Sequence, residues 1–223
     1  MIKLIKIELE KFNFKKYIKN AIIANIIILG TLTLITCPIK DLKIDPLSNY
    51  TTVFTMIDSL VRATFMIFSS VLISDIVINE LKNKKINIKK TITAKIIIII
   101  MFTFLTIMLS NVFIEISFYF LDKGFNLIPN KLNLNIITRN TLTIFMYAIT
   151  SSLMTLISLF LGIIKKSTFV TILSSIVLVS IVCSYNNGFS LNSIIAIPLS
   201  LAALGILSAY LSVKQIENSS ENK

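Results

Sequence analysis

The chain of 223 residues contains no histidine and no tryptophan, and it has only two cysteines. Without histidine it cannot build a His-ligated zinc site, a Ser-His-Asp hydrolase triad or the H-E-x-x-H motif of a metalloprotease. It also lacks a G-x-x-x-x-G-K-[ST] loop, so it cannot bind and hydrolyse ATP by that route. Cys37 and Cys183 are interpreted as isolated small apolar residues, with a disulfide between them as the alternative.

Charged residues are scarce as well, at 15% of the chain, whereas 55% of the residues are hydrophobic and the mean hydropathy is +0.84. A soluble domain of this length would carry more charge and a lower mean hydropathy. The net charge of +11 is typical of nucleic-acid-binding proteins, but the lysines cluster at the edges of apolar runs. The composition therefore predicts an integral membrane protein with no nucleic-acid partner.

Six apolar runs are long enough to cross a hydrocarbon core, which needs about 20 residues per helix. In lipid only helices and closed barrels satisfy their own backbone, and these runs lack the alternation of a barrel strand. The sequence therefore predicts an all-α membrane protein with six transmembrane helices, followed by a polar, disordered tail over residues 214–223. Pro198 is expected to kink or break the last helix. The predicted spans are 21–37, 53–78, 96–121, 141–164, 168–185 and 193–212.

The basic residues are divided unequally between the two sides of these spans. If the N-terminus is cytoplasmic, 16 of the 22 Lys and Arg residues fall inside and five outside, and Arg62 lies within a span. The positive-inside rule therefore predicts that both termini are cytoplasmic. Heavy use of Ile, Asn and Lys suggests an AT-rich bacterial genome, so the expected location is the bacterial cytoplasmic membrane.

Residues 1–20 form a different kind of segment. Four apolar residues between Ile2 and Phe12 recur at spacings of three and four, and polar residues follow them one position behind. On a helix the two sets occupy adjoining faces, which favours a basic amphipathic helix lying along the inner headgroups. An ordinary basic flank that only orients the first span is the alternative. The residues assigned to this interfacial helix are Lys3, Lys6, Glu8, Lys11, Lys15 and Lys16.

Four ionisable residues lie within the predicted spans, where each needs a partner or water. Asp58 and Arg62 are four residues apart and can pair on one helix face, with snorkelling to the interface as the alternative. Asp75 lies near the inner end and is expected to reach cytoplasmic water. Glu115 has no basic neighbour on its own helix, so we expect a packed structural carboxyl, with a substrate-path or coupling role as the alternative.

Between the second and third spans, residues 79–95 read NELKNKKINIKKTITAK, with six lysines and a single glutamate. This segment and the N-terminus resemble those of ABC-2-type permeases of the bacitracin and lantibiotic self-protection group. Members often begin with E-L-x-K-x-x-[KR], which Glu8, Leu9 and Lys11 match, with Lys15 and Lys16 slightly displaced. They carry E-[YF]-K-N-K-T-I, then R-K-K and A-K, between spans two and three. The matches there are Glu80, Lys82, Asn83, Lys84, Ile86, Lys89, Lys90, Ala94 and Lys95, while Leu81 and Lys85 are substitutions.

The segment lacks the apolar stretch that usually separates the two halves of the family pattern. The resemblance implies a permease subunit that exports or clears a peptide antibiotic or another amphipathic substrate, with no catalytic residue, cofactor or metal of its own. Two such permeases would pair, identical or homologous, and a separate cytosolic ATPase would use ATP and Mg²⁺. Residues 80–95 would be the coupling loop to that ATPase. A purely topological anchor at the headgroups is the alternative. The residues assigned to the coupling loop are Glu80, Lys82, Asn83, Lys84, Lys85, Lys89, Lys90 and Lys95.

Two other functions remain open. A substrate-capturing subunit of an ATP-dependent vitamin importer is also small and six-spanned, and would retain its ligand when isolated. A membrane-embedded enzyme, such as a lipid transferase, would use Glu115 and Asp58 as acid and base. The basic amphipathic N-terminus and the long charged second loop argue against the importer, and the position of Glu115 and Asp58 on different spans gives the enzyme no recognisable constellation.

Overall fold

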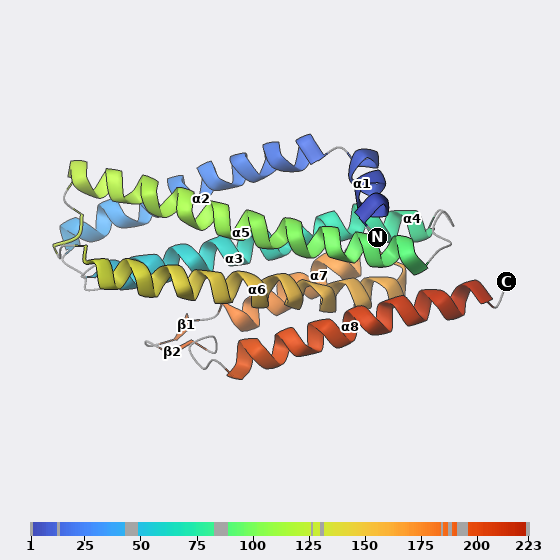
Figure 1. Ribbon diagram of the computed structural model, residues 1–223. Helices are drawn as coiled ribbons and strands as arrows, with labels where there is room; N and C mark the ends of the chain where they lie inside the picture. Colours follow the sequence, from blue (N-terminus) through green and yellow to red (C-terminus); the bar gives the residue numbers. More distant parts are fainter. Residues whose placement is uncertain are drawn as a thin grey trace.

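The computed structural model describes residues 2–12, 14–42, 49–82, 89–125, 127–129, 132–183, 185–186, 189–190 and 196–221. A short helix, α1 (Ile2–Lys11), lies across one end of a bundle of longer helices (Figure 1). Both termini of the described chain lie at this end of the bundle, which we call the terminal end (Figure 1). The bundle helices are α2 (Phe14–Leu42), α3 (Tyr50–Ile73), α5 (Lys89–Phe125), α6 (Leu134–Lys165), α7 (Thr168–Val182) and α8 (Ala196–Glu221).

Helix α3 does not end at Ile73 but continues through a π-helical turn, η2 (Ser74–Ile78), into the single turn α4 (Asn79–Lys82). Between α7 and α8, two short strands, β1 (Tyr185–Asn186) and β2 (Phe189–Ser190), pair antiparallel. The prediction of an all-α architecture is confirmed except for this small hairpin.

Among the described residues, five helical stretches are long and apolar enough to cross a membrane. The predicted run 168–185 forms the 15-residue helix α7. At 1.5 Å per residue that helix is about 22 Å long, which is shorter than a hydrocarbon core of about 30 Å. The apolar run was long enough, but the helix ends at Val182 and the chain turns into the hairpin.

Three further sequence expectations need correction. Residues 1–20 are not one helix, because α1 ends at Lys11 and Phe14 already begins the long helix α2. Pro198 does not kink the last helix, because it lies in the first turn of α8, where its missing N–H breaks no helical hydrogen bond. Residues 214–221 of the predicted disordered tail are helical, since α8 continues to Glu221.

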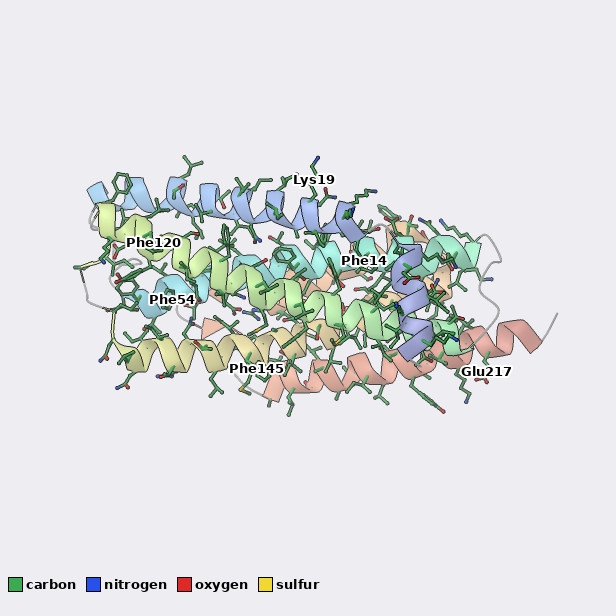
Figure 2. The ribbon with its side chains drawn as sticks, turned by 45° about the horizontal axis from the view of Figure 1, so that its top comes forward. Phe14, Lys19, Phe54, Phe120, Phe145 and Glu217 are labelled. Carbon is green, nitrogen blue, oxygen red and sulfur yellow. The ribbon has the colours of Figure 1, made fainter. Side chains whose placement is uncertain are left out.

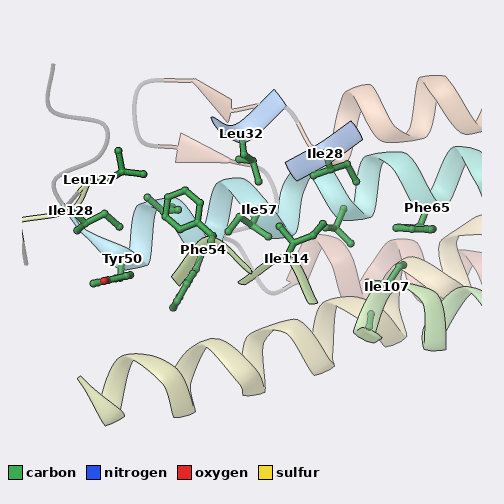
Figure 3. Packing of buried hydrophobic residues seen from close by; sticks show 14 of the residues in the cluster. Ile28, Leu32, Tyr50, Phe54, Ile57, Phe65, Ile107, Ile114, Leu127 and Ile128 are labelled. Atoms are coloured by element: carbon green, nitrogen blue, oxygen red, sulfur yellow. The ribbon is translucent and has the colours of Figure 1, made fainter. Parts of the chain in front are cut away.

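The core runs along α3, which is the most enclosed helix of the bundle. In its most apolar stretch 67% of the residues are buried, compared with 17% in that of α2, which lies at the periphery. In the half of the bundle away from the termini, Phe54 and Ile57 of α3 pack against Ile114 of α5 and Ile28 of α2 (Figure 3). A second apolar cluster around Ile73, Ile96 and Leu159 fills the terminal end.

Helices α6 and α8 approach each other closely at Gly205. A Cβ atom placed there would clash with the backbone carbonyl of Leu153, so only glycine fits. Small residues allow this kind of close backbone approach between membrane helices.

The outer surface of the bundle is strongly apolar. Large side chains on several helices are mostly exposed, including Leu34 at 75%, Phe169 at 69% and Leu109 at 68%. A soluble monomer rarely exposes so much contiguous apolar surface, whereas lipid covers it at no cost. We conclude that the chain is a multi-pass, membrane-embedded protein.

Candidate functional site

The most unusual polar residue of the structure is Lys95, whose side chain is fully buried. It lies in α5 between the core residues Ile92 and Ile96, so the packing of that helix carries its ammonium group inward. The ammonium donates to the backbone carbonyl of Ile76 at 3.0 Å and to the carboxylate of Glu80. The second carboxylate, Glu8 of α1, lies 3.5 Å away. The contact with Glu8 is an ion pair and not a hydrogen bond, so two of the three N–H donors of the ammonium are engaged in hydrogen bonds.

A second lysine completes the group. The ammonium of Lys11 in α1 lies 3.8 Å from Glu80 and 3.9 Å from Glu8. It contacts Oε1 of each glutamate, whereas Lys95 contacts Oε2 of each. Two lysines and two glutamates therefore alternate in one group with no net charge, which we call the terminal cluster (Glu8, Lys11, Glu80, Lys95). Burial of a charge is costly unless it is paired, and pairing with two carboxylates meets that condition.

The terminal cluster joins segments that are far apart in the sequence: α1 supplies Glu8 and Lys11, α4 supplies Glu80, and α5 supplies Lys95. Phe12 adds an aromatic ring whose centroid lies 5.7 Å from the Lys95 ammonium. Figure 1 shows α1, α4 and the start of α5 together at the terminal end. A displacement of α4 would therefore be transmitted to both α1 and α5.

The π-helical turn is part of this arrangement, because the Ile76 carbonyl that binds Lys95 belongs to η2. Single π-helical turns occur frequently at functional sites. Asp75, in the same turn, accepts a hydrogen bond from the Tyr17 hydroxyl at 2.6 Å and a longer one from the Asn79 amide at 3.3 Å. Asp75 is half-buried and hydrogen-bonded to Tyr17 of α2, a contact that the sequence does not predict.

Helix α1 presents a different face to the protein than expected. Glu8 is buried, whereas Ile7 and Leu9 beside it are 52% and 41% exposed. The apolar residues Ile7 and Leu9 remain available to lipid on the outward side. The other lysines assigned to the interfacial helix, at 3, 6, 15 and 16, are exposed. Among the assigned residues Glu8 is the buried one, and its contact with Lys95 anchors α1 to α5.

The structure describes only part of the predicted coupling segment. Glu80 and Lys95 come together, and Lys82 is exposed at the end of α4. Asn83, Lys84 and Lys85 lie outside the described residues, and so do the side chains of Lys89 and Lys90.

A second ionic group lies within the bundle. The Arg62 guanidinium is 2.8 Å from the Asp58 carboxylate, and both residues are 3% exposed. The predicted pair is therefore present and enclosed, so neither side chain snorkels. Asn111 of α5 donates to Asp58 at 3.4 Å, and the Tyr147 ring of α6 lies 4.5 Å from the Arg62 guanidinium carbon.

Glu115 has a partner on a different helix. The Asn140 amide of α6 donates to its carboxylate at 2.7 Å. This contact agrees with the expectation that the carboxyl packs against protein. No signal in the sequence points to Asn140, because the partner lies 25 residues away on the next helix.

The sequence also does not predict the burial of Lys95, because the positive-inside rule already accounts for a lysine at the end of a basic segment.

Among the described residues, no group of three or more Cys, Asp or Glu side chains is arranged to hold a metal ion. Cys183 carries a free thiol, and the Cys37 side chain lies outside the described residues.

Comparison with known proteins gives one informative result. The uncharacterized protein YcbO of Bacillus subtilis (strain 168) is 36% identical to this chain over 222 residues, covering 96% of this chain and 97% of YcbO. The chain belongs to the YcbO family. The similarity extends over nearly the whole length of both chains, so it includes α1 as well as the membrane bundle. No protein-family model and no solved structure matches the chain.

Proposed function

We propose that the chain is the membrane-spanning permease subunit of an ABC-2-type transporter driven by a separate ATPase. Its substrate is a peptide antibiotic or another amphipathic molecule that the complex exports or clears from the membrane. Both termini lie in the cytoplasm of a bacterial cell, and the chain pairs with a second permease, identical or homologous. The ATPase uses ATP and Mg²⁺, and the permease binds neither.

The observation that carries this proposal is the terminal cluster. Glu80 is in the segment that resembles the coupling loop of these permeases, and its carboxylate binds the fully buried Lys95. A loop that only satisfied the positive-inside rule would need exposed lysines and no buried acid–base contacts. A loop that transmits force needs a rigid attachment to the helices it moves.

Geometry makes this attachment a rigid one. Lys95 has no exposed surface, so any displacement of α4 must either carry α5 along or break a buried ion pair. Glu8 extends the same attachment to α1, whose exposed lysines lie where they can hold anionic headgroups. In the proposed mechanism, closure of the ATPase pushes α4, and α5 and α1 move with it.

The alternatives gain less support from the described residues. As an acid–base pair for an enzyme, Asp58 and Glu115 are poorly suited, because Arg62 and Asn140 already engage their carboxylates. A vitamin-capturing subunit remains distinguishable by its ligand, which would stay bound to the isolated chain.

The test is co-purification of the tagged chain with the ATPase encoded beside it. We expect a stable complex for the wild type and weakened capture for Glu80→Gln combined with Lys82→Gln. The matched control is Asp122→Asn, which removes a buried carboxylate contacted by Tyr50 and the Ile128 amide at the opposite end of the bundle. Unchanged capture and transport by the Glu80 and Lys82 variant would refute the coupling role. A small ligand retained without any ATPase would favour the vitamin importer.

A further inference from the structure

A layer of polar side chains lies in the half of the bundle away from the termini, where α3, α5 and α6 pack together. Figure 2 labels Phe54, Phe120 and Phe145, one on each of these helices. Three side-chain contacts join the helices pairwise, α3 with α5, α3 with α6 and α5 with α6. The six residues that make these contacts, which we call the polar layer, are Asp58, Asn111, Arg62, Tyr147, Glu115 and Asn140.

The polar layer contains two acids but a single base. Arg62 pairs with Asp58, and among the described residues no lysine or arginine forms an ion pair with Glu115. From α6, Tyr147 lies over the Arg62 guanidinium and Arg139 is exposed. The lysines of α2 whose side chains are described, at 15, 16 and 19, lie in its first two turns at the terminal end. The terminal cluster balances two acids with two bases, whereas the polar layer lacks one positive charge.

Glu115 lies at a depth where an unpaired negative charge is costly. About 15 Å of α5 separate it from the end of that helix at Phe125. Over this stretch Ile116 and Phe120 are 52% and 66% exposed, which places this part of α5 against lipid. Asp58 is close enough to act on Glu115 electrostatically, and its negative charge adds to the cost. A carboxyl in such surroundings takes up a proton instead of remaining charged.

The polar layer also contains a buried acceptor that has no donor. The Asn111 side chain is fully buried, and its amide nitrogen donates to Asp58 and to the Ile107 carbonyl at 3.1 Å. Its amide oxygen has no hydrogen-bond partner among the described residues. Glu115 follows Asn111 by four residues, so the two side chains are neighbours on one face of α5. A hydroxyl on the Glu115 carboxyl would supply the missing donor, while its Oε1 keeps the Asn140 amide.

A proton fits this site better than a metal ion does. The amide of Asn111 points an N–H donor at Asp58, and the amide of Asn140 points one at Glu115, whereas a metal ion needs several free oxygen ligands. We propose that Glu115 is a proton-binding site, which carries a proton on Oε2 at neutral pH and donates it to the Asn111 amide oxygen. The proton comes from solvent and returns to it on release. In the protonated state the carboxyl connects Asn140 of α6, through Asn111, to Asp58 of α3. This inference is independent of the ABC-2 assignment.

Infrared spectroscopy tests the proposal directly, because a protonated carboxyl has a carbonyl stretch that a carboxylate lacks. The full chain is produced with isotope-labelled glutamate, which separates its bands from those of aspartate and lipid esters, and is reconstituted in phosphatidylcholine vesicles. We expect a labelled carboxylic-acid band at neutral pH that disappears on alkaline titration. The band should be absent in Glu115→Gln and unchanged in Glu10→Gln, which removes an exposed glutamate of α1.

Absence of the labelled band from the wild-type chain at neutral pH would overturn the proposal, and this measurement requires no variant to fold. A band that survives in Glu115→Gln would place the proton on another glutamate and would also overturn it. Replacing choline chloride with sodium chloride should leave the titration midpoint unchanged. A midpoint lowered by sodium would mean that a metal ion competes for the site, which contradicts the proposal.

The two asparagines should shift the midpoint in opposite directions. Asn111→Leu removes the acceptor for the proton, so the proton affinity of Glu115 should fall about fivefold. Asn140→Leu removes a donor that binds the carboxylate more strongly than the acid, so the proton affinity should rise about fivefold. Asparagines with a purely structural role would shift the midpoint in the same direction or not at all, and that result would overturn the proposal.

Discussion

The terminal cluster and the Asp58–Arg62 pair are both buried ionic groups, but they are built in opposite ways. Asp58 and Arg62 lie four residues apart on α3, so a single helix brings them together. Glu8, Glu80 and Lys95 come from three helices and meet only when α1 folds against the bundle. The local pair therefore satisfies charge inside one helix, whereas the terminal cluster fixes the relative positions of separate elements. Of the two groups, only the terminal cluster includes a residue of α4, the element that we propose the ATPase moves.

The largest expected effect comes from Lys95→Met. It leaves two carboxylates together with only the exposed Lys11 to balance them, and breaking a buried pair costs about 3–5 kcal/mol. The free energy of unfolding in mixed micelles should fall by that amount, and capture of the ATPase should fall with it. A variant of wild-type stability would show that Lys95 is not held as described.

Arg62→Met should lower the free energy of unfolding by about 3 kcal/mol, at the lower end of the same range. Asn111 still donates to Asp58 in this variant, so the carboxylate keeps one partner. Capture of the ATPase per folded molecule should be unchanged, because neither residue of the pair contacts α1 or α4. If Arg62→Met also prevents capture, the contrast between the two groups does not hold.

Glu8→Gln should cost less, about 1–2 kcal/mol, since Lys95 keeps Glu80 and the Ile76 carbonyl. The specific result is local, because α1 loses its anchor while the rest of the bundle stays packed. Hydrogen exchange should become faster in residues 2–11 and remain unchanged in α3. Faster exchange throughout the chain would mean that Glu8 supports the whole fold and not only α1.

The smallest effect is expected for Lys11→Gln. The Lys11 side chain is 57% exposed and its carboxylate contacts are 3.8 and 3.9 Å long, so its loss should cost less than about 1 kcal/mol. The shift of the thermal midpoint in detergent should be small and should shrink further at high salt. A decrease in the free energy of unfolding as large as that of Lys95→Met would mean that Lys11 contributes most of the stability of the cluster.

The sequence was sufficient for those parts of the fold that depend on local pattern. Apolar runs and basic flanks predicted the helices and a separate N-terminal segment, and the spacing of Asp58 and Arg62 predicted their pair. The short α7 could not be predicted, because the apolar run 168–185 continues past the residue where the helix ends. Hydropathy alone contains no information about that hairpin.

Contacts between distant segments explain the rest of the differences. Lys95 follows five other lysines and looks like one more exposed cation, yet it is buried because α1 folds back and brings Glu8 to it. The Ile76 carbonyl accepts a hydrogen bond from Lys95 and belongs to a π-helical turn that no residue pattern predicted. Asn140 meets Glu115 only through the packing of α5 against α6.

The most direct test of the coupling role is site-specific photo-crosslinking at the end of α4. A photoreactive amino acid replaces the exposed Lys82 in one variant and the exposed Arg139, at the start of α6, in the other. With the ATPase co-expressed, the account predicts a crosslink from position 82 that changes with ATP, and none from position 139. A complex that purifies intact but gives no crosslink from position 82 would contradict the account.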